Sequence, residues 1–90
     1  MKEIFHYLHL GSDVTVHSDD LIGIFDIERV TVKKAVNEFL KAKQKSGKIY
    51  YVSLDLPKSF AVVSGGEDED KVYVTNVSTL TLKKRLKKSK

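Results

Sequence analysis

The chain has 90 residues, enough for one domain, and its 41% hydrophobic and 31% charged residues are typical of a soluble globular protein. It contains no cysteine, which excludes disulfides and thiolate metal sites, and no apolar run approaches the roughly 18 residues of a membrane span. The formal net charge is +4, but six of the 16 Lys and Arg residues lie in the last eight positions. The other ten face 12 Asp and Glu, so the body carries a net charge of −2, and overall basicity is little evidence for nucleic-acid binding.

The first third of the chain predicts strands separated by turns. Residues 5–10, FHYLHL, alternate polar and apolar side chains as a strand does, and the turn-forming residues 11–13, GSD, end it. The segment 14–18, VTVHS, follows before a second polar break. Residues 21–27, LIGIFDI, are apolar almost throughout, which predicts a strand covered on both faces. Gly23 in this strand predicts close approach of another backbone.

The period of the pattern changes between residues 32 and 46, where the apolar positions repeat with helical spacing. These positions are Val32, Ala35, Val36, Phe39 and Leu40. Thr31 is placed to cap the amino end of this helix, and Gly47 is placed to end it in the left-handed conformation. We predict one principal helix here.

The remaining segments predict further strands and a final helix. Residues 48–54, KIYYVSL, are rich in β-branched and aromatic residues, and Pro57 closes that strand. Residues 59–64 and 71–77 pair as a hairpin across the polar turn GGEDED. Ser78 is placed to cap a short helix that has an apolar stripe. The stripe consists of Leu80, Leu82 and Leu86.

Together these elements predict the α+β fold class. We expect a single domain over residues 1–82, with about five mostly antiparallel strands, one main helix and a short C-terminal helix, and a basic tail over residues 83–90. The opening residues are too short and too polar for a signal peptide, so a cytoplasmic location without membrane association is expected. A domain this small buries only about 60% of its unfolded surface, which favours oligomerisation as a source of stability.

The sequence contains no motif of a known enzyme class. His6 and His9 are three residues apart, so on a strand they point to opposite faces and form no zinc pair. The glycines at 65–66 lack the spacing of a dinucleotide or phosphate loop, and no GxSxG turn occurs. The carboxylates at 19–20 and 67–70 fall in predicted turns, where such groups are usually solvated. We therefore expect no catalysis, no metal, no cofactor and no small-molecule substrate.

The basic side chains are the chemical feature that points to a partner. The tail cations can release counterions from a nucleic-acid duplex, which gives sequence-blind and salt-dependent binding, or they can form a solvated end that keeps the protein soluble. They are Lys83, Lys84, Arg85, Lys87, Lys88 and Lys90. The same two readings apply to Lys33 and Lys34 at the start of the predicted helix.

Four stretches of the chain resemble one bacterial family. They are YLHLGSDVTVHSDDLIGIFDIE, VTVKKAVNEFLKAKQKSGKI, PKSFAVV and KVYVTNVSTLTLKKR, which run from about Phe5 to Arg85. On these motifs the chain is similar to the small extracellular matrix regulatory proteins of Gram-positive bacteria, and it resembles their B branch more than their A branch. The resemblance implies DNA binding and transcriptional control of biofilm-matrix genes. It also implies self-association, because A-branch members assemble into ring-shaped homo-oligomers that present basic residues to DNA.

The resemblance also suggests site residues. A-branch relatives carry two arginines before the strand that corresponds to AVV, and here the matching positions are Pro57 and Lys58. A further basic position of the A branch is Asp20 here. Lys58 and Ser59 resemble the B-branch form of the loop, and the lysine pair at 33–34 matches basic positions at the start of the family's helix.

Three hypotheses follow from the sequence. In the first, the protein is a DNA-binding regulator and a homo-oligomer, in which Lys58 and its loop, with Lys33 and Lys34, contact phosphates and the tail adds nonspecific attraction. In the second, it is an oligomeric protein-interaction module without DNA binding, which the negative body, Asp20 and Pro57 favour. In the third, it binds RNA, because a lysine-rich surface does not distinguish RNA from DNA.

Overall fold

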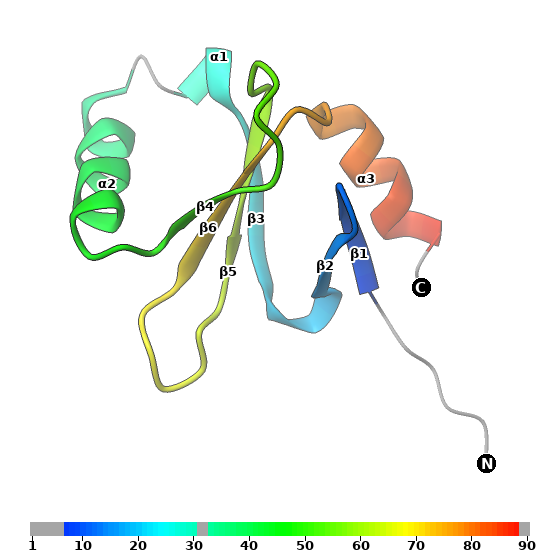
Figure 1. Ribbon diagram of the computed structural model, residues 1–90, viewed down its shortest axis with the longest axis horizontal. Helices are drawn as coiled ribbons and strands as arrows, with labels where there is room; N and C mark the ends of the chain where they lie inside the picture. The colour runs from blue at the N-terminus through cyan, green and yellow to red at the C-terminus, as the bar shows by residue number, and fades with distance from the viewer. Residues whose placement is uncertain (1–6, 31–32, 89–90) are drawn as a thin grey trace.

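The computed structural model describes residues 7–30 and 33–88, and within them it has six strands and a set of short helices (Figure 1). The strands are β1 (Tyr7–Gly11), β2 (Val14–His17), β3 (Leu21–Asp26), β4 (Ile49–Tyr51), β5 (Ser59–Val63) and β6 (Lys71–Thr75). The helices are the 3-10 turn η1 (Ser18–Asp20), α1 (Ile27–Val30), α2 (Lys34–Lys45) and α3 (Thr79–Lys88). The predicted α+β fold class is confirmed.

Four of the strands form a central sheet in the order β3-β5-β6-β4. β5 pairs antiparallel with both β3 and β6, whereas β4 pairs parallel with β6. The other two strands, β1 and β2, form a separate antiparallel hairpin, so the structure has one strand more than the sequence indicated. The turn between them is where residues 11–13 predicted it, and all three residues there have positive φ angles.

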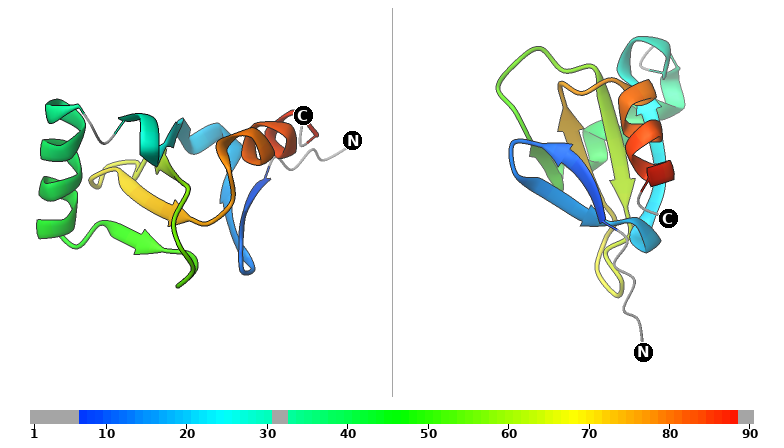
Figure 2. Two further views of the ribbon diagram at one scale, coloured as in Figure 1. Left: turned by 90° about the horizontal axis from the view of Figure 1, so that it is seen from above. Right: turned by 90° about the vertical axis from the view of Figure 1, so that its right-hand side faces the viewer.

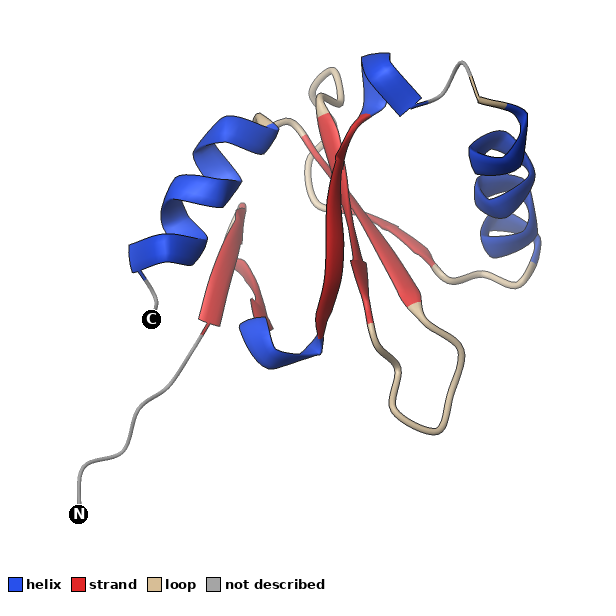
Figure 3. Cartoon of the chain, turned by 180° about the vertical axis from the view of Figure 1, so that it is seen from behind, coloured by secondary structure: helices blue, strands red, loops and turns tan. Residues whose placement is uncertain are grey.

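The central sheet has a different cover on each face (Figures 1 and 3). Side chains alternate along β5, so Phe60 and Val62 pack toward α2, while Ala61 and Val63 pack toward the β1–β2 hairpin and α3. All five residues of β5 are buried, because this strand is central and is covered on both sides. The core is therefore two apolar clusters, one on each face of the sheet.

The ends of α2 show how local sequence sets the helix. Gly47 has a φ of 74°, and the N–H groups of Gly47 and Lys48 bond carbonyl oxygens of the last helical turn. Gly47 thus ends the helix in the left-handed conformation, as predicted. Thr31, the predicted cap, lies outside the described residues, and Lys33 occupies the N-cap position without a side-chain hydrogen bond. The side chains of α2 that pack on the sheet are Val36, Phe39 and Leu40.

The start of the final helix α3 is also determined by the local sequence. Ser78 caps it as predicted, because its hydroxyl accepts a hydrogen bond from the N–H of Thr81 at 3.2 Å. Leu82 is fully buried and Leu86 packs against the same cluster. Leu80, by contrast, is 64% exposed, so the predicted apolar stripe is wrong for this leucine.

β3 differs most from its prediction. Within the described residues it pairs with β5 alone, so it is an edge strand of the sheet. Ile22 is 58% exposed and Phe25 is 37% exposed, so the prediction that this strand is covered on both faces is wrong. Gly23 does not make room for another backbone, because a Cβ there would lie 2.8 Å from two ring carbons of Phe25. Part of the apolar surface of β3 therefore lies beyond the part of the sheet that α2 covers.

Candidate nucleic-acid interface

Lys58, which the family resemblance singles out, lies immediately before β5. Its N–H donates to the carbonyl oxygen of Thr75 at 2.9 Å, and its own carbonyl accepts from the N–H of Ile27 at 3.1 Å. The backbone is therefore held between the end of β6 and the start of α1, while the side chain is exposed. A fixed backbone with a free ammonium group suits a phosphate contact, because little ordering is needed when the anion binds.

Two shallow cavities bring other basic side chains to the same end of the sheet. One has a volume of about 240 Å³ and includes Lys58 in its lining, and the other has a volume of about 380 Å³ and includes Arg29 and Lys83. Both are lined by Asp26 and Thr79, so they form one continuous surface. We call Arg29, Lys58 and Lys83 the basic cluster.

Two carboxylates reduce the charge of the basic cluster. Asp26 caps α1, since its Oδ1 accepts a hydrogen bond from the N–H of Glu28 at 2.9 Å. Glu28 is exposed and lines the same cavity as Lys58. Three cations beside two carboxylates leave a small local excess of positive charge, and solvent ions screen it over about 10 Å. One copy of the cluster therefore attracts a phosphate only weakly.

Arg29 is a member of the basic cluster that the sequence analysis missed. It lies on α1, which has four residues and is too short to show a helical period. The available signal was Asp26, a residue type that favours the N-cap, followed by an acidic residue in the first turn. That signal locates the helix but does not mark Arg29 as part of a site.

Ser59 does not belong to the interface, although the sequence analysis placed it there. It is fully buried, and its hydroxyl donates to the carbonyl oxygen of Val77 at 2.6 Å. The hydroxyl is therefore used to hold the start of β5 against the chain beyond β6. The buried hydroxyl of Ser59 offers no donor at the surface, which argues against a contact between this side chain and a phosphate.

The predicted lysines of α2 lie apart from the two cavities. Lys33 and Lys34 are exposed at the amino end of the helix, and Figure 1 shows this end on the same side of the molecule as α1. The first turn of α2 contains no acidic residue. Cations at the positive end of a helix dipole destabilise the helix slightly, so these two lysines do not serve its stability.

The predicted tail is largely a continuation of α3, which extends through residue 88. Arg85 is engaged within the fold, because its Nη1 donates to the carbonyl oxygen of His9 at 3.0 Å and ties α3 to β1. The side chain of Lys88, and Lys90, lie outside the described part of the chain. The exposed cations of α3 are Lys83, Lys84 and Lys87.

Acidic side chains gather at the opposite end of the sheet, where η1 and the β5–β6 turn lie (Figure 1). These two segments are joined by a hydrogen bond from the N–H of Ser64 to the carbonyl oxygen of Asp20 at 2.7 Å. The acidic residues are Asp19, Asp20, Glu67, Asp68, Glu69 and Asp70. Glu69 pairs with Lys43 of α2 at 3.4 Å. The domain therefore has a basic end where β5 begins and an acidic end where β5 stops.

Within residues 7–30 and 33–88, no three His, Asp or Glu side chains come together as metal ligands, and no helix is long and apolar enough to cross a bilayer. The fold and the site thus define a small α+β domain whose main chemical feature is the arrangement of its surface charges.

The comparison with known proteins agrees with the sequence motifs. The chain is 39% identical over 79 residues to extracellular matrix regulatory protein B of Bacillus subtilis (strain 168), and the match covers 88% of each chain. The protein therefore belongs to the family of extracellular matrix regulatory proteins, and its likeness to the B branch is confirmed. No family model matches the sequence. The name of this relative describes a regulatory protein.

Proposed function

We propose that this protein is a DNA-binding transcriptional regulator of biofilm-matrix genes, and that it acts as a homo-oligomer through repeated, weak phosphate contacts. The name of its relative supports the regulatory role. The observation that carries the DNA contact is the basic cluster, in which Lys58 has a fixed backbone and an exposed ammonium group beside Arg29 and Lys83.

The separation of charge along the sheet supports one orientation on DNA. A polyanion attracts the basic end and repels the acidic end around η1 and the β5–β6 turn. The electrostatic field of the polyanion therefore orients the domain before contact. Residues 1–82 carry a net charge of −2 although the whole chain carries +4, so the attraction of one copy to a polyanion comes from the cations at its basic end and on α3. Lys33, Lys34 and the exposed lysines of α3 add sequence-independent attraction.

Repetition makes such a contact effective. Each copy offers the few phosphate contacts of one basic cluster, and linking copies converts later contacts into intramolecular ones at high effective concentration. Assembly also stabilises a small domain by mass action. Contacts of this kind position the protein on the duplex and leave sequence to be read by other means.

Duplex binding across a salt series tests the proposal. The variant Lys58→Ala/Lys83→Ala removes two cations of the basic cluster, and its matched control, Lys41→Ala/Lys45→Ala, removes two exposed lysines of α2 outside it. For each copy engaged, we expect the first variant to lower the salt slope by about 2, since each phosphate contact contributes roughly 0.9. The control should keep most of the slope. A flat salt response of the wild type, or equal losses in the two variants, would contradict the proposal.

A second candidate function is an oligomeric protein-interaction module without DNA binding. The exposed apolar side chains of Ile22, Leu54 and Leu56 favour it, as do Asp20 and Pro57 at positions that are basic in the A branch. No duplex binding in dilute buffer, together with recovery of a defined protein partner, would favour this alternative. An RNA duplex that competes as well as DNA would instead favour the RNA-binding hypothesis.

A further inference from the structure

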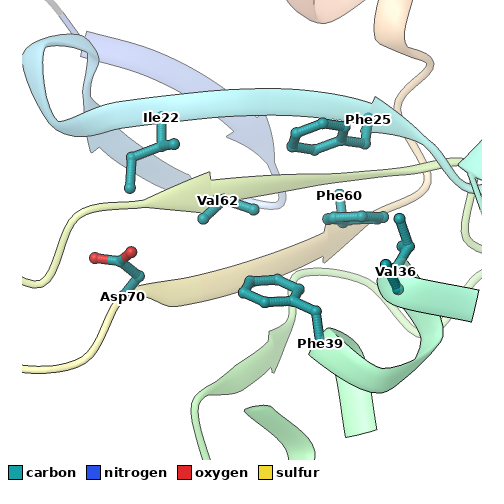
Figure 4. A pocket seen from close by; sticks show the side chains of 8 residues that line it. Ile22, Phe25, Val36, Phe39, Phe60, Val62 and Asp70 are labelled. Carbon is teal, nitrogen blue, oxygen red and sulfur yellow. The ribbon is translucent and has the colours of Figure 1, made fainter. Parts of the chain in front are cut away.

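An apolar groove lies between β3 and α2, on the face of the sheet that α2 covers (Figure 4). Its volume is about 350 Å³, and Asp70 is the only charged residue of its lining. The other lining residues are Ile22, Phe25, Ala35, Val36, Phe39, Phe60 and Val62. We call it the β3–α2 groove. Exposed apolar surface of this kind at the edge of a domain marks an interaction site.

The strand that forms one wall of the groove is open along its outer edge. β3 runs for six residues, LIGIFD, and among the described strands it pairs with β5 alone. Proteins usually protect such an edge with proline, lysine, a very short strand or a β-bulge. β3 has six residues with neither proline nor lysine, and it has one register shift, between Leu21 and Gly23. An apolar edge with so little protection is expected to be covered in the working protein.

A second exposed apolar feature is the segment 53–57 between β4 and β5, which we call the leucine loop. Leu54 is 103% exposed and Leu56 is 83% exposed. Between them, Asp55 accepts a hydrogen bond from the Nδ2 of Asn76 at 3.2 Å. The carboxylate is therefore turned toward the protein while two leucines face water, the reverse of an ordinary solvated loop. The loop is held in a conformation that presents apolar side chains.

The groove and the leucine loop lie at different edges of the sheet. β3 is the first strand in the order β3-β5-β6-β4, and the leucine loop leaves the last one. Figure 2, in its left panel, shows the loop projecting on the side of the molecule away from β3. One chain therefore cannot place its own leucines in its own groove, but a second copy can.

We propose that the leucine loop of one copy docks in the β3–α2 groove of a second copy, so that the copies join head to tail. This rests on the self-association in the proposed function and adds the two surfaces that make the contact. Because loop and groove are different surfaces, every copy offers one of each. Such heterologous contacts give a closed ring or an open chain.

The small size of the contact favours a second copy over a foreign partner. Two leucines and the rim of one groove bury less than the roughly 800 Å² per partner of a standard stable interface. A single contact is therefore weak, whereas in a ring every copy makes two contacts and the closing contact is intramolecular. Lys58 lies two residues beyond Leu56, so the repeat also spaces the basic clusters regularly along the assembly.

Two variants that each disable one surface test the contact. Leu54→Asp/Leu56→Asp alters the loop and leaves the groove intact, and Ile22→Glu alters the groove and leaves the loop intact. All three side chains are largely exposed, so the variants should fold, which thermal melting checks. The matched control for solution mass is Leu80→Asp, another exposed leucine that lies outside both surfaces; because Leu80 lines the cavity of Arg29 and Lys83, this variant is not used for duplex binding.

Solution mass, measured without DNA, gives the readout. The wild type and the Leu80 control should be oligomers, and each surface variant should associate at least about 100-fold more weakly, because buried anchor residues dominate small contacts. An equal mixture of the two surface variants should form a dimer and nothing larger, since one intact loop meets one intact groove. A monomeric wild type, a surface variant with the wild-type mass, or a mixture that stays monomeric at every concentration would overturn the proposal.

Duplex binding by the same variants separates this inference from the proposed function. If the contact is correct, the monomeric variants should bind DNA more weakly than the wild type while keeping a salt-dependent response. Unchanged masses in both variants refute the contact, whatever the protein does with DNA. Loss of all duplex binding in the wild-type oligomer refutes the proposed function and leaves the contact intact.

Discussion

The two faces of the central sheet are covered to very different degrees. Toward the β1–β2 hairpin and α3, the side chains of Leu8, Leu10 and Leu82 are wholly buried. Toward α2, Phe39 and Leu40 are only partly buried, and no residue of this 12-residue helix is buried. The first cover is built from two elements and the second from one narrow helix. The chain therefore buries a complete apolar core on the face of the β1–β2 hairpin and α3, and it leaves apolar surface exposed on the face of α2. A contact between copies can bury the most additional apolar surface on the α2 face.

The largest effect on stability should come from truncating one leucine on each face to alanine, and the two losses test whether the faces differ in cover. Leu82→Ala should lower the free energy of unfolding by about 2–5 kcal/mol, because it removes a fully buried side chain from a closed core. Leu40→Ala should cost less than half as much, because the side chain is already partly in contact with water. Urea denaturation measures both losses.

The measurement should be made in the Leu54→Asp/Leu56→Asp background, so that assembly does not add to the stability of either variant. Equal losses at the two positions would show that the α2 face is as complete as the other. In that case the two faces would not differ in how completely they are covered, and the explanation of the exposed β3–α2 groove would be wrong.

Features that depend on near neighbours could be predicted from the sequence. Gly47 ends α2 and Ser78 caps α3 through hydrogen bonds within one turn, so the pattern alone identified both. The exposure of β3 could not be predicted in this way. An apolar run such as LIGIFDI looks the same whether its cover comes from the same chain or from another copy, and the sheet order that puts β3 at an edge depends on residues far away in sequence.

The candidate site shows the same division. Lys58 followed from the family resemblance, and the structure leaves its side chain at the surface. Ser59 is its neighbour in sequence and has a polar side chain, but it is buried because β5 is covered on both faces of the sheet. Arg29 joins the basic cluster only because α1 folds beside the start of α3. Which polar residues meet at a site is thus set by long-range packing.

A smaller effect should come from the hydroxyl that links β6 to the hairpin on the completed face. Thr75 is 1% exposed, donates to the carbonyl oxygen of Leu10 at 2.6 Å and accepts from the N–H of Val77. Thr75→Val should lower the free energy of unfolding by about 1–3 kcal/mol, because it leaves a buried carbonyl without its donor. Thr15→Val, at an exposed position of β2, should change it by less than about 0.5 kcal/mol. Similar losses in chemical denaturation would contradict a special role for the buried hydroxyl.

The smallest effect should come from Gly23 in the edge strand β3. It tests how the ring of Phe25 is placed at the wall of the β3–α2 groove. Gly23 has no positive φ angle, so alanine fits its backbone, but the added Cβ would lie 2.8 Å from the ring of Phe25, which stacks on Phe60 at 5.2 Å. Gly23→Ala should therefore cost about 1 kcal/mol by displacing that ring. In a Phe25→Leu background the same change should be neutral or stabilise by a few tenths of a kcal/mol, because alanine restricts the unfolded chain. A double-mutant cycle by urea denaturation measures the difference. If Gly23→Ala still lowers the free energy of unfolding in the Phe25→Leu background, an interaction other than the contact with the Phe25 ring requires glycine at this position. Gly23 would then have no role in placing the Phe25 ring at the wall of the groove.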